Sequence, residues 1–103
     1  MVFSWKLLKV HGDSMVPILR NGDYIVAKKI KLGDKIKKGD YVEVSHPDLG
    51  SILKIVKSLD KKYIRIEGIS PLSADSDQIG QIPYSNISAR ALFCISKRGL
   101  IRL

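Results

Sequence analysis

The sequence predicts a mostly β fold of short, largely antiparallel strands, with one short helical turn and no long helix. From Tyr24 onward, runs rich in β-branched and aromatic residues recur at short intervals, each bounded by Gly, Asp, Pro or lysine-rich turns. The chain has 103 residues, which is enough for one hydrophobic core and too few for two domains. We therefore expect residues 1–103 to form a single domain.

The elements follow from local patterns. The N-terminal run MVFSWKLLKV predicts an edge strand or an amphipathic segment, and Pro17 followed by ILRNGD predicts a single helical turn that ends at Gly22. The polar stretch 69–80 is the one long loop, and long ordered loops in small domains are often functional. Six further runs predict strands: 23–30, 39–46, 50–59, 62–68, 80–84 and 89–96.

Composition limits the class of partner and compartment. The formal net charge of +8 attracts nucleic acid, anionic lipid or acidic proteins. The lysine runs carry no interleaved aromatic residues and no nucleic-acid motif, so we expect mainly a solvated basic surface. Cys94 is the one cysteine, which excludes an internal disulfide, gives no zinc site and fits the cytoplasm.

No segment is long and apolar enough to span a membrane. The N-terminal run has about half the ~20 residues that a transmembrane helix needs, and Lys6 and Lys9 interrupt it. No small-residue cleavage site follows, so it does not resemble a secretory signal. Weak association with a membrane surface through Trp5 and the two lysines stays open.

The stretch HGDSMVP raises the question of a nucleophile. Ser14 in such a turn is commonly a capping residue, so the motif alone indicates little. A nucleophilic serine needs a nearby base, either a histidine or a lysine kept neutral by an apolar site. His11 and His46 are available, but no carboxylate is placed to orient either, and we expect both at the surface.

Lys54 is the better candidate for a base. It is the one charge within the run ILKIV, and strand alternation places it on the same face as Ile52 and Val56. If that face is interior, burial lowers the pKa of the amine and leaves part of it neutral near pH 7. Lys57, on the opposite face and nearer the turn, is the competing lysine.

Five segments in order resemble the Ser-Lys peptidases of the signal peptidase I and LexA type. GDSMVP resembles the nucleophile box, GDYIVAKK the strand after it, IKKGDYVEVSHPD the next strand pair and ILKIVK the lysine strand. The segment EGISPLSADSDQIGQIPYSNISARALF is similar to the box before the last strand. This resemblance runs from about residue 12 to residue 93 and implies a shared β fold with peptidase activity.

The resemblance also implies roles for single residues. Ser14 matches the nucleophile, Lys54 the general base and Ser73 the serine that orients the lysine. Apolar residues after the nucleophile help such enzymes to accept small side chains near the cleaved bond, or they are plain core. In this chain those residues are Met15, Val16 and Ile18. No metal or cofactor is implied.

Some positions depart from the family pattern. Gly68, Asp75 and Ser76 match the last box, but Ile69, Ser70 and Asp77 stand where it has Asp, Asn and Arg. The Asp-Arg pair of signal peptidases therefore cannot form. Residue 12 is Gly where some signal peptidases have a hydroxyl for the oxyanion hole, which leaves the backbone N–H of Ser14 to stabilise the oxyanion.

The resemblance favours a small processing peptidase over its larger relatives. Only 13 residues precede Ser14, so we expect neither a membrane anchor nor a segment for self-cleavage. The remaining similarity is to stand-alone peptidases such as those that mature nickel-type superoxide dismutase. We therefore expect a peptidase that acts in trans on a leader or precursor protein.

Two alternatives stay open. The first is a noncatalytic LexA-like binding module that uses its basic surface for a protein or nucleic-acid partner. The second is an acyl-transfer site at SILK, Ser51 to Lys54, which mimics the Ser-x-x-Lys motif of penicillin-binding proteins. That motif needs a helix, whereas this run reads as a strand.

Overall fold

The computed structural model describes residues 4–12, 15, 18–31, 34–46, 50–67 and 81–103. Within them the fold is mostly β, which confirms the predicted class. The strands are β1 (Trp5–Lys9), β2 (Tyr24–Lys29), β3 (Tyr41–His46), β4 (Gly50–Leu59), β5 (Tyr63–Glu67), β6 (Gln81–Pro83), β7 (Ile87–Ser96) and β8 (Gly99–Arg102), with a 3-10 turn at η1 (Tyr84–Asn86).

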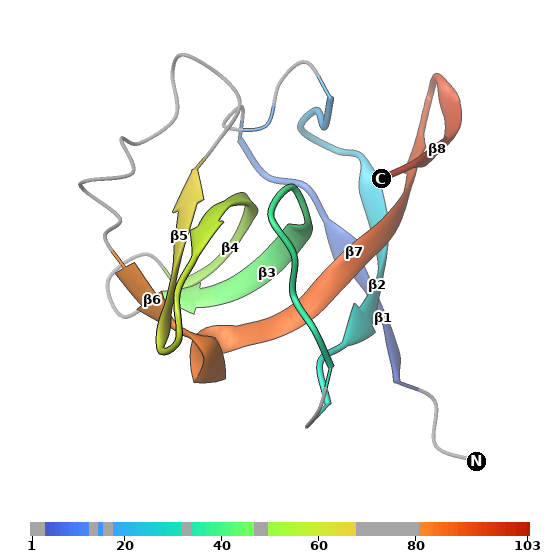
Figure 1. The fold of residues 1–103 in the computed structure, drawn as a ribbon. Helices are drawn as coiled ribbons and strands as arrows, with labels where there is room; N and C mark the ends of the chain where they lie inside the picture. The colour runs from blue at the N-terminus through green and yellow to red at the C-terminus, as the bar shows by residue number, and fades with distance from the viewer. Residues whose placement is uncertain (1–3, 13–14, 16–17, 32–33, 47–49, 68–80) are drawn as a thin grey trace.

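All described strands belong to one antiparallel sheet in the order β1-β2-β7-β3-β4-β5-β6 (Figure 1). The long strand β7 organises it, because it pairs with β2 on one side. On its other side β7 pairs with β3 through its first half and with β8 through its second half. β7 thereby joins β2 and β3, from the first half of the chain, to β8 at its C-terminal end.

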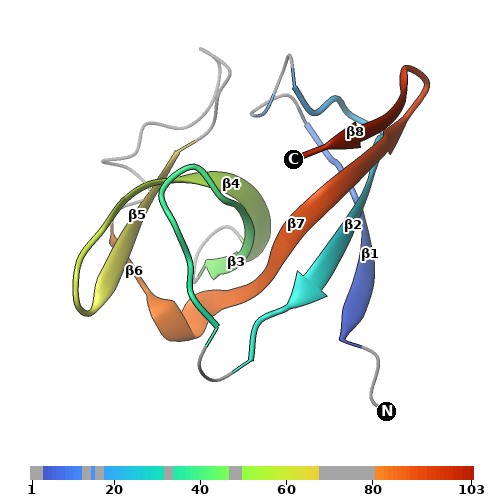
Figure 2. The same cartoon turned by 45° about the vertical axis from the view of Figure 1, so that its right-hand side comes forward.

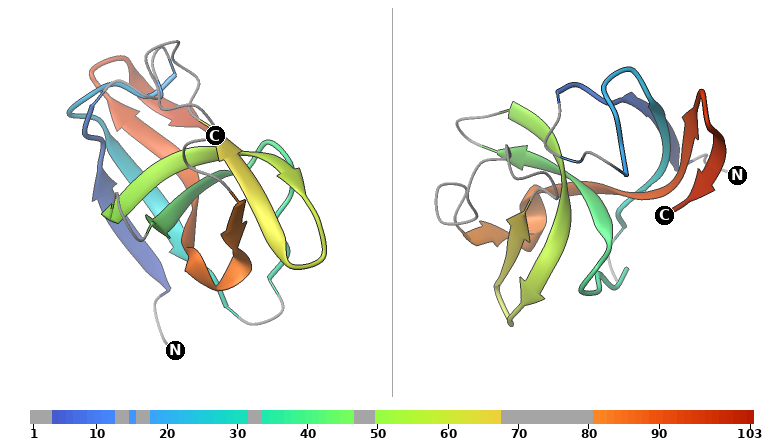
Figure 3. Two further views of the ribbon diagram at one scale, coloured as in Figure 1. Left: turned by 90° about the vertical axis from the view of Figure 1, so that its left-hand side faces the viewer. Right: turned by 90° about the horizontal axis from the view of Figure 1, so that it is seen from above.

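The sheet curls (Figure 3), and hydrophobic clusters lie on both of its faces. Strand alternation produces this arrangement, since neighbouring residues of β3 point to opposite sides. One cluster includes Met15, Leu19, Ile25, Ala27, Ala89, Ala91 and Cys94. The other consists of Val42, Val44, Val56, Ile64, Ile66, Ile82 and Ile87.

The predicted turn after Pro17 is represented in the described residues by one hydrogen bond. The N–H of Leu19 donates to the carbonyl of Met15 at 2.9 Å, which is the spacing of a single helical turn. At the end of this turn Gly22 has φ +93°, a backbone conformation that favours glycine. The Asn21-Gly22 turn signal was therefore read correctly.

The structure adds elements that the sequence did not predict. The hairpin partner β8 and the 3-10 turn η1 were missed, and β7 begins at Ile87, two residues before the predicted run. The first strand was predicted, and β1 lies at one end of the sheet order, as expected of an edge strand. Among the described residues, no helix is long and apolar enough to cross a membrane.

Candidate active site

The chain that leads to Ser14 is held by main-chain and side-chain hydrogen bonds. The N–H of Val10 donates to the carbonyl of Asp23 at 2.8 Å, and the N–H of Gly22 donates to the carbonyl of Val10 at 2.9 Å. Beyond them, the N–H of Gly12 donates to the side-chain oxygen of Asn21 at 3.0 Å. Main-chain hydrogen bonding to the start of β2 thus continues to Val10, and the Asn21 side chain holds the chain to within two residues of Ser14.

The chain that follows Ser14 is also anchored. Met15 is buried in the core. The guanidinium of Arg98, from the turn between β7 and β8, donates to the carbonyl of Ile18 at 2.9 Å. The segment carrying Ser14 is therefore fixed on both sides by residues that the structure describes.

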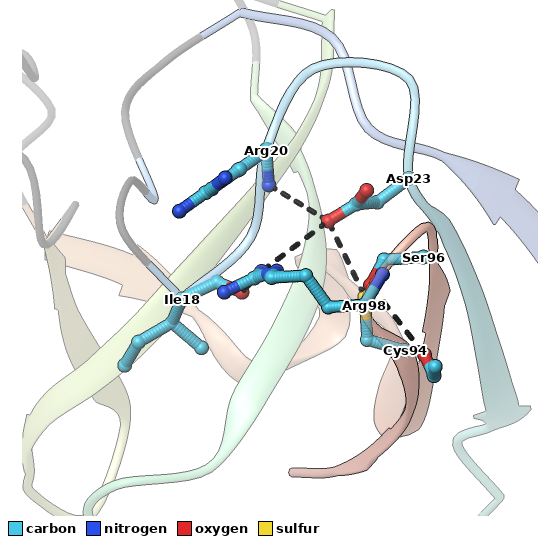
Figure 4. A network of polar contacts seen from close by, with 7 residues as sticks. Ile18, Arg20, Asp23, Cys94, Ser96 and Arg98 are labelled. Atoms are coloured by element: carbon cyan, nitrogen blue, oxygen red, sulfur yellow. Dashed lines mark hydrogen bonds and ion pairs between the residues drawn. The ribbon is translucent and has the colours of Figure 1, made fainter.

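Asp23 ties this segment to the end of β7 (Figure 4). One of its carboxylate oxygens accepts hydrogen bonds from the N–H of Arg20 at 3.0 Å and from the Cys94 thiol at 3.5 Å. The same oxygen lies 3.9 Å from the guanidinium of Arg98. Burial, followed by the charge of Asp23, raises the pKa of Cys94 to about 11, so this thiol is not a candidate nucleophile.

Lys54 lies on an interior face of the sheet. This is the environment in which the sequence analysis expects a lowered pKa for its amine. The residue is 5% exposed, lies opposite Val42 in the pairing of β3 with β4, and shares its face with Val56, which is 2% exposed. Burial lowers the pKa of its ammonium group, because a charged amine loses hydration inside the protein. The amine is therefore easier to deprotonate than an ordinary lysine.

Lys57, the competing lysine, is in a different environment. It is exposed, lies beside the irregularity between Val56 and Ser58, and forms an ion pair with Glu67 at 3.8 Å. A solvated lysine beside a carboxylate lacks the apolar surroundings that a lysine base needs. The structure thus separates the two candidates and favours Lys54.

A cleft of about 250 Å³ runs beside Lys54. Two stretches of consecutive residues line it, 8–11 and 51–54, together with Met15, Ile25 and Glu43. Consecutive strand residues point alternately to opposite faces, so a cleft that touches four in a row lies along the edge of the strand. The cleft is therefore bordered by two strand edges.

Both of these edges lack a neighbouring strand among the described residues. β1 pairs only with β2. The first half of β4 pairs with β3, whereas β5 pairs with β4 only from Ile55 onward. Unpaired N–H and C=O groups along an edge are a template for an added extended peptide.

Glu43 is a second buried ionisable group in the cleft that the sequence reading missed. It is 7% exposed, and its two oxygens accept hydrogen bonds from Lys6 at 2.6 Å and from Ser51 at 2.9 Å. Lys6 forms an ion pair with Glu43 and so balances its charge. The signal was present in the sequence, since Glu43 is flanked by Val42 and Val44, just as Lys54 is the lone charge in an apolar run.

The structure brings some predicted site residues together. Met15 and Lys54 line the same cleft, whereas Ile18 is half-buried against the core that includes Met15. His11 is exposed and also lines the cleft.

Other predicted site residues cannot be placed. Ser14, Val16 and Ser73 lie outside the described residues, as do all the positions discussed in the last box, so their roles stay predictions. Ser51 and Lys54 lie on one β-strand, which rules out the helix that a Ser-x-x-Lys acyl-transfer motif requires. No group of three or more metal-ligating side chains is found in the described part of the chain.

Comparison with known proteins identifies the family of this chain. A family model described as Peptidase S24-like matches residues 4–88, from the start of β1 to the start of β7. A search of curated proteins finds no match to this chain. The matched region contains both strand edges of the cleft, Lys54 and the positions of Ser14 and Ser73. With most of its length matched, this chain belongs to the Peptidase S24-like family.

Proposed function

We propose that this protein is a serine endopeptidase in which Ser14 is the nucleophile and Lys54 the general base. The observation that carries the proposal is the environment of Lys54, which is 5% exposed and has a lowered pKa beside a peptide-sized cleft. Burying a lysine costs stability, and perturbed pKa values cluster at functional sites. Membership of a serine peptidase family supports the same conclusion.

The cleft supports binding of the substrate as an extended strand. A peptide lying between residues 8–11 and residues 51–54 can form main-chain hydrogen bonds with both edges. Its side chains then point alternately toward the core side of the cleft and away from it. On the core side the half-buried side chains of Leu8 and Leu53 offer an apolar surface, which suits small or apolar substrate residues.

The proposed reaction is acyl transfer to Ser14 followed by hydrolysis. Neutral Lys54 takes the hydroxyl proton of Ser14 as the oxygen attacks the peptide carbonyl, and the backbone N–H of Ser14 stabilises the oxyanion. The protonated amine of Lys54 then gives its proton to the leaving amine, and the acyl-enzyme forms. Water, deprotonated by Lys54, hydrolyses the ester and restores Ser14. Ser73 orients the Lys54 amine in this scheme.

The proposed substrate is a separate precursor protein. The family resemblance favours removal of a leader in trans, and the leader of nickel-type superoxide dismutase is one candidate. The core-side surface of the cleft does not single out one precursor, so substrate discovery has to start from an unbiased set of peptides.

The test is cleavage of a peptide library derived from a bacterial proteome, with new N-termini identified by mass spectrometry. We expect the wild type to produce a defined set of termini, and Ser14→Ala and Lys54→Met to produce none. The rate of cleavage should increase with pH through the lowered pKa of Lys54 and be greatest on the alkaline side of neutrality.

Lys57→Met is the matched control. It removes a lysine of the same strand three residues away, but one that is exposed and paired with Glu67, so it should retain most activity. Equal loss of activity in Lys54→Met and Lys57→Met, or full activity of Ser14→Ala, would exclude the proposed dyad. The remaining possibility would then be a noncatalytic binding module.

A further inference from the structure

The outward face of β1, β2, β7 and β8 carries a surface that neither the fold nor the cleft explains. These four strands lie together on one side of the molecule, and the β4–β5 hairpin lies on the other (Figure 2). Their inward side chains form the core around Ile25 and Cys94. Their outward side chains, which we call the outer face, are all exposed or half-buried.

The outer face is unusually apolar for a surface. Eight large hydrophobic residues of the described chain are exposed, and five of them lie on this face. The register of the sheet places them in adjacent rows, so they form one patch rather than scattered positions. They are Trp5 (50% exposed), Leu7 (63%), Tyr24 (42%), Ile95 (46%) and Leu100 (70%).

Every charge on the outer face is positive. Its charged residues are Lys9, Lys28, Arg90 and Arg102, and no carboxylate points outward from these four strands. Lys28 and Arg90 stand directly opposite each other on β2 and β7. Like charges in that position destabilise a sheet, and an anion bound at this face would remove the repulsion.

The positive end of the outer face continues into a second cleft. This cleft, of about 270 Å³, is lined by Lys28 and Arg90 and by three further lysines, Lys29, Lys35 and Lys37. Asp34, the one carboxylate among the described residues that line it, accepts a hydrogen bond from the backbone N–H of Lys31. An apolar patch and a strongly cationic cleft are therefore continuous.

We propose that the outer face docks on the surface of an anionic phospholipid bilayer. Apolar rings and aliphatic side chains interleaved with Lys and Arg are the composition of interfacial membrane-binding surfaces, where rings enter the headgroup region and cations meet lipid phosphates. A second copy of the chain is disfavoured, because face-to-face packing brings four cations against four cations. The proposal does not depend on peptidase activity.

Trp5 provides a direct reporter, because it is the one tryptophan in the sequence and lies on the outer face. The full chain is mixed with vesicles of phosphatidylcholine alone or of phosphatidylcholine with about a third of phosphatidylglycerol. On the anionic vesicles we expect Trp5 emission to shift to shorter wavelength and to become protected from acrylamide quenching. The chain should also sediment with anionic vesicles and stay in solution with neutral ones.

Two variants test the residues, each with a matched control. Replacing Lys28 and Arg90 with Gln should weaken binding to anionic vesicles about 25-fold, since each cation near such a surface contributes about fivefold. Replacing Lys61 and Lys62 with Gln removes the same charge from the β4–β5 turn and should change binding less than twofold. Leu7→Ala should weaken binding several-fold, whereas Leu59→Ala, in β4, should not.

Several results would overturn the proposal. Equal weakening by the two double charge variants would show that net charge alone attracts the chain. The absence of a Trp5 emission shift on anionic vesicles would also overturn the proposal. If the chain then bound tightly to polyglutamate or to a DNA oligonucleotide, the face would be assigned to an acidic protein or to nucleic acid. A concentration-dependent dimer whose formation protects Trp5 would assign the face to a second copy.

Discussion

Replacing Lys54 with methionine separates the two consequences of burying an amine, which are lower stability and a usable base. Methionine keeps the length and apolar stem of lysine, so the packing beside Val42, its partner in the sheet register, is retained and no large cavity forms. What disappears is the cost of holding an ammonium group in a site where the residue is 5% exposed. We therefore expect Lys54→Met to be inactive and more stable than the wild type at pH 7.

The size of this effect follows from proton linkage. Each pH unit by which burial lowers a pKa corresponds to about 1.4 kcal/mol of unfolding free energy. For a chain of about 100 residues, that amount changes Tm by roughly 6–11 °C. The gain in Lys54→Met should be of this order for each unit of lowering.

The pH dependence has a definite sign. The folded protein holds the Lys54 proton less tightly than the unfolded chain, in which the pKa has its ordinary value of 10.5. Between the lowered pKa and 10.5 the unfolded state binds more protons, so the stability of the wild type rises with pH. The stability advantage of Lys54→Met should therefore be largest below the lowered pKa and shrink as pH rises toward 10.5.

The assay is urea unfolding of both proteins from pH 6 to pH 10, followed by circular dichroism. Groups that titrate in both proteins cancel in the difference, which isolates Lys54. A Lys54→Met variant that is less stable than the wild type at pH 7, with a difference independent of pH, would refute the reasoning. Such a result would mean that the ammonium group is stabilised in the folded state and is not a ready base.

Three other changes test the surroundings of the site. Arg98→Met removes the hydrogen bond to the carbonyl of Ile18, so it should lower kcat on any identified substrate. In urea unfolding it should cost only about 1–2 kcal/mol of stability. Unchanged kcat would show that this contact does not position the nucleophile segment. Cys94, buried and with its pKa raised to about 11, should resist iodoacetamide at pH 8 in the folded protein and react in urea, as followed by mass spectrometry. Lys6→Met removes the partner of the buried Glu43 carboxylate, so it should lower Tm and cost about 1–3 kcal/mol of unfolding free energy. Adding Glu43→Gln should recover most of this loss. Strict additivity of the two changes would contradict a coupled pair.

The sequence alone determined the local features of this protein. Alternation along residues 50–59 identified a strand and placed Lys54 with Val56, because strand side chains alternate with a period of two. Asn21-Gly22 identified a turn, because glycine adopts the positive φ that the turn requires. Each of these depends on residues that are close in the chain.

Only the tertiary structure decided which strands meet. Alternation shows which side chains share a face, but every apolar strand face is compatible with many partners, so pairing depends on the packing of the whole sheet. The placement of β7 between β2 and β3 curls the sheet until the edges of β1 and β4 border one cleft. The same curl brings Lys6 to Glu43, 37 residues away, and a contact at that separation leaves no periodic signal in the sequence.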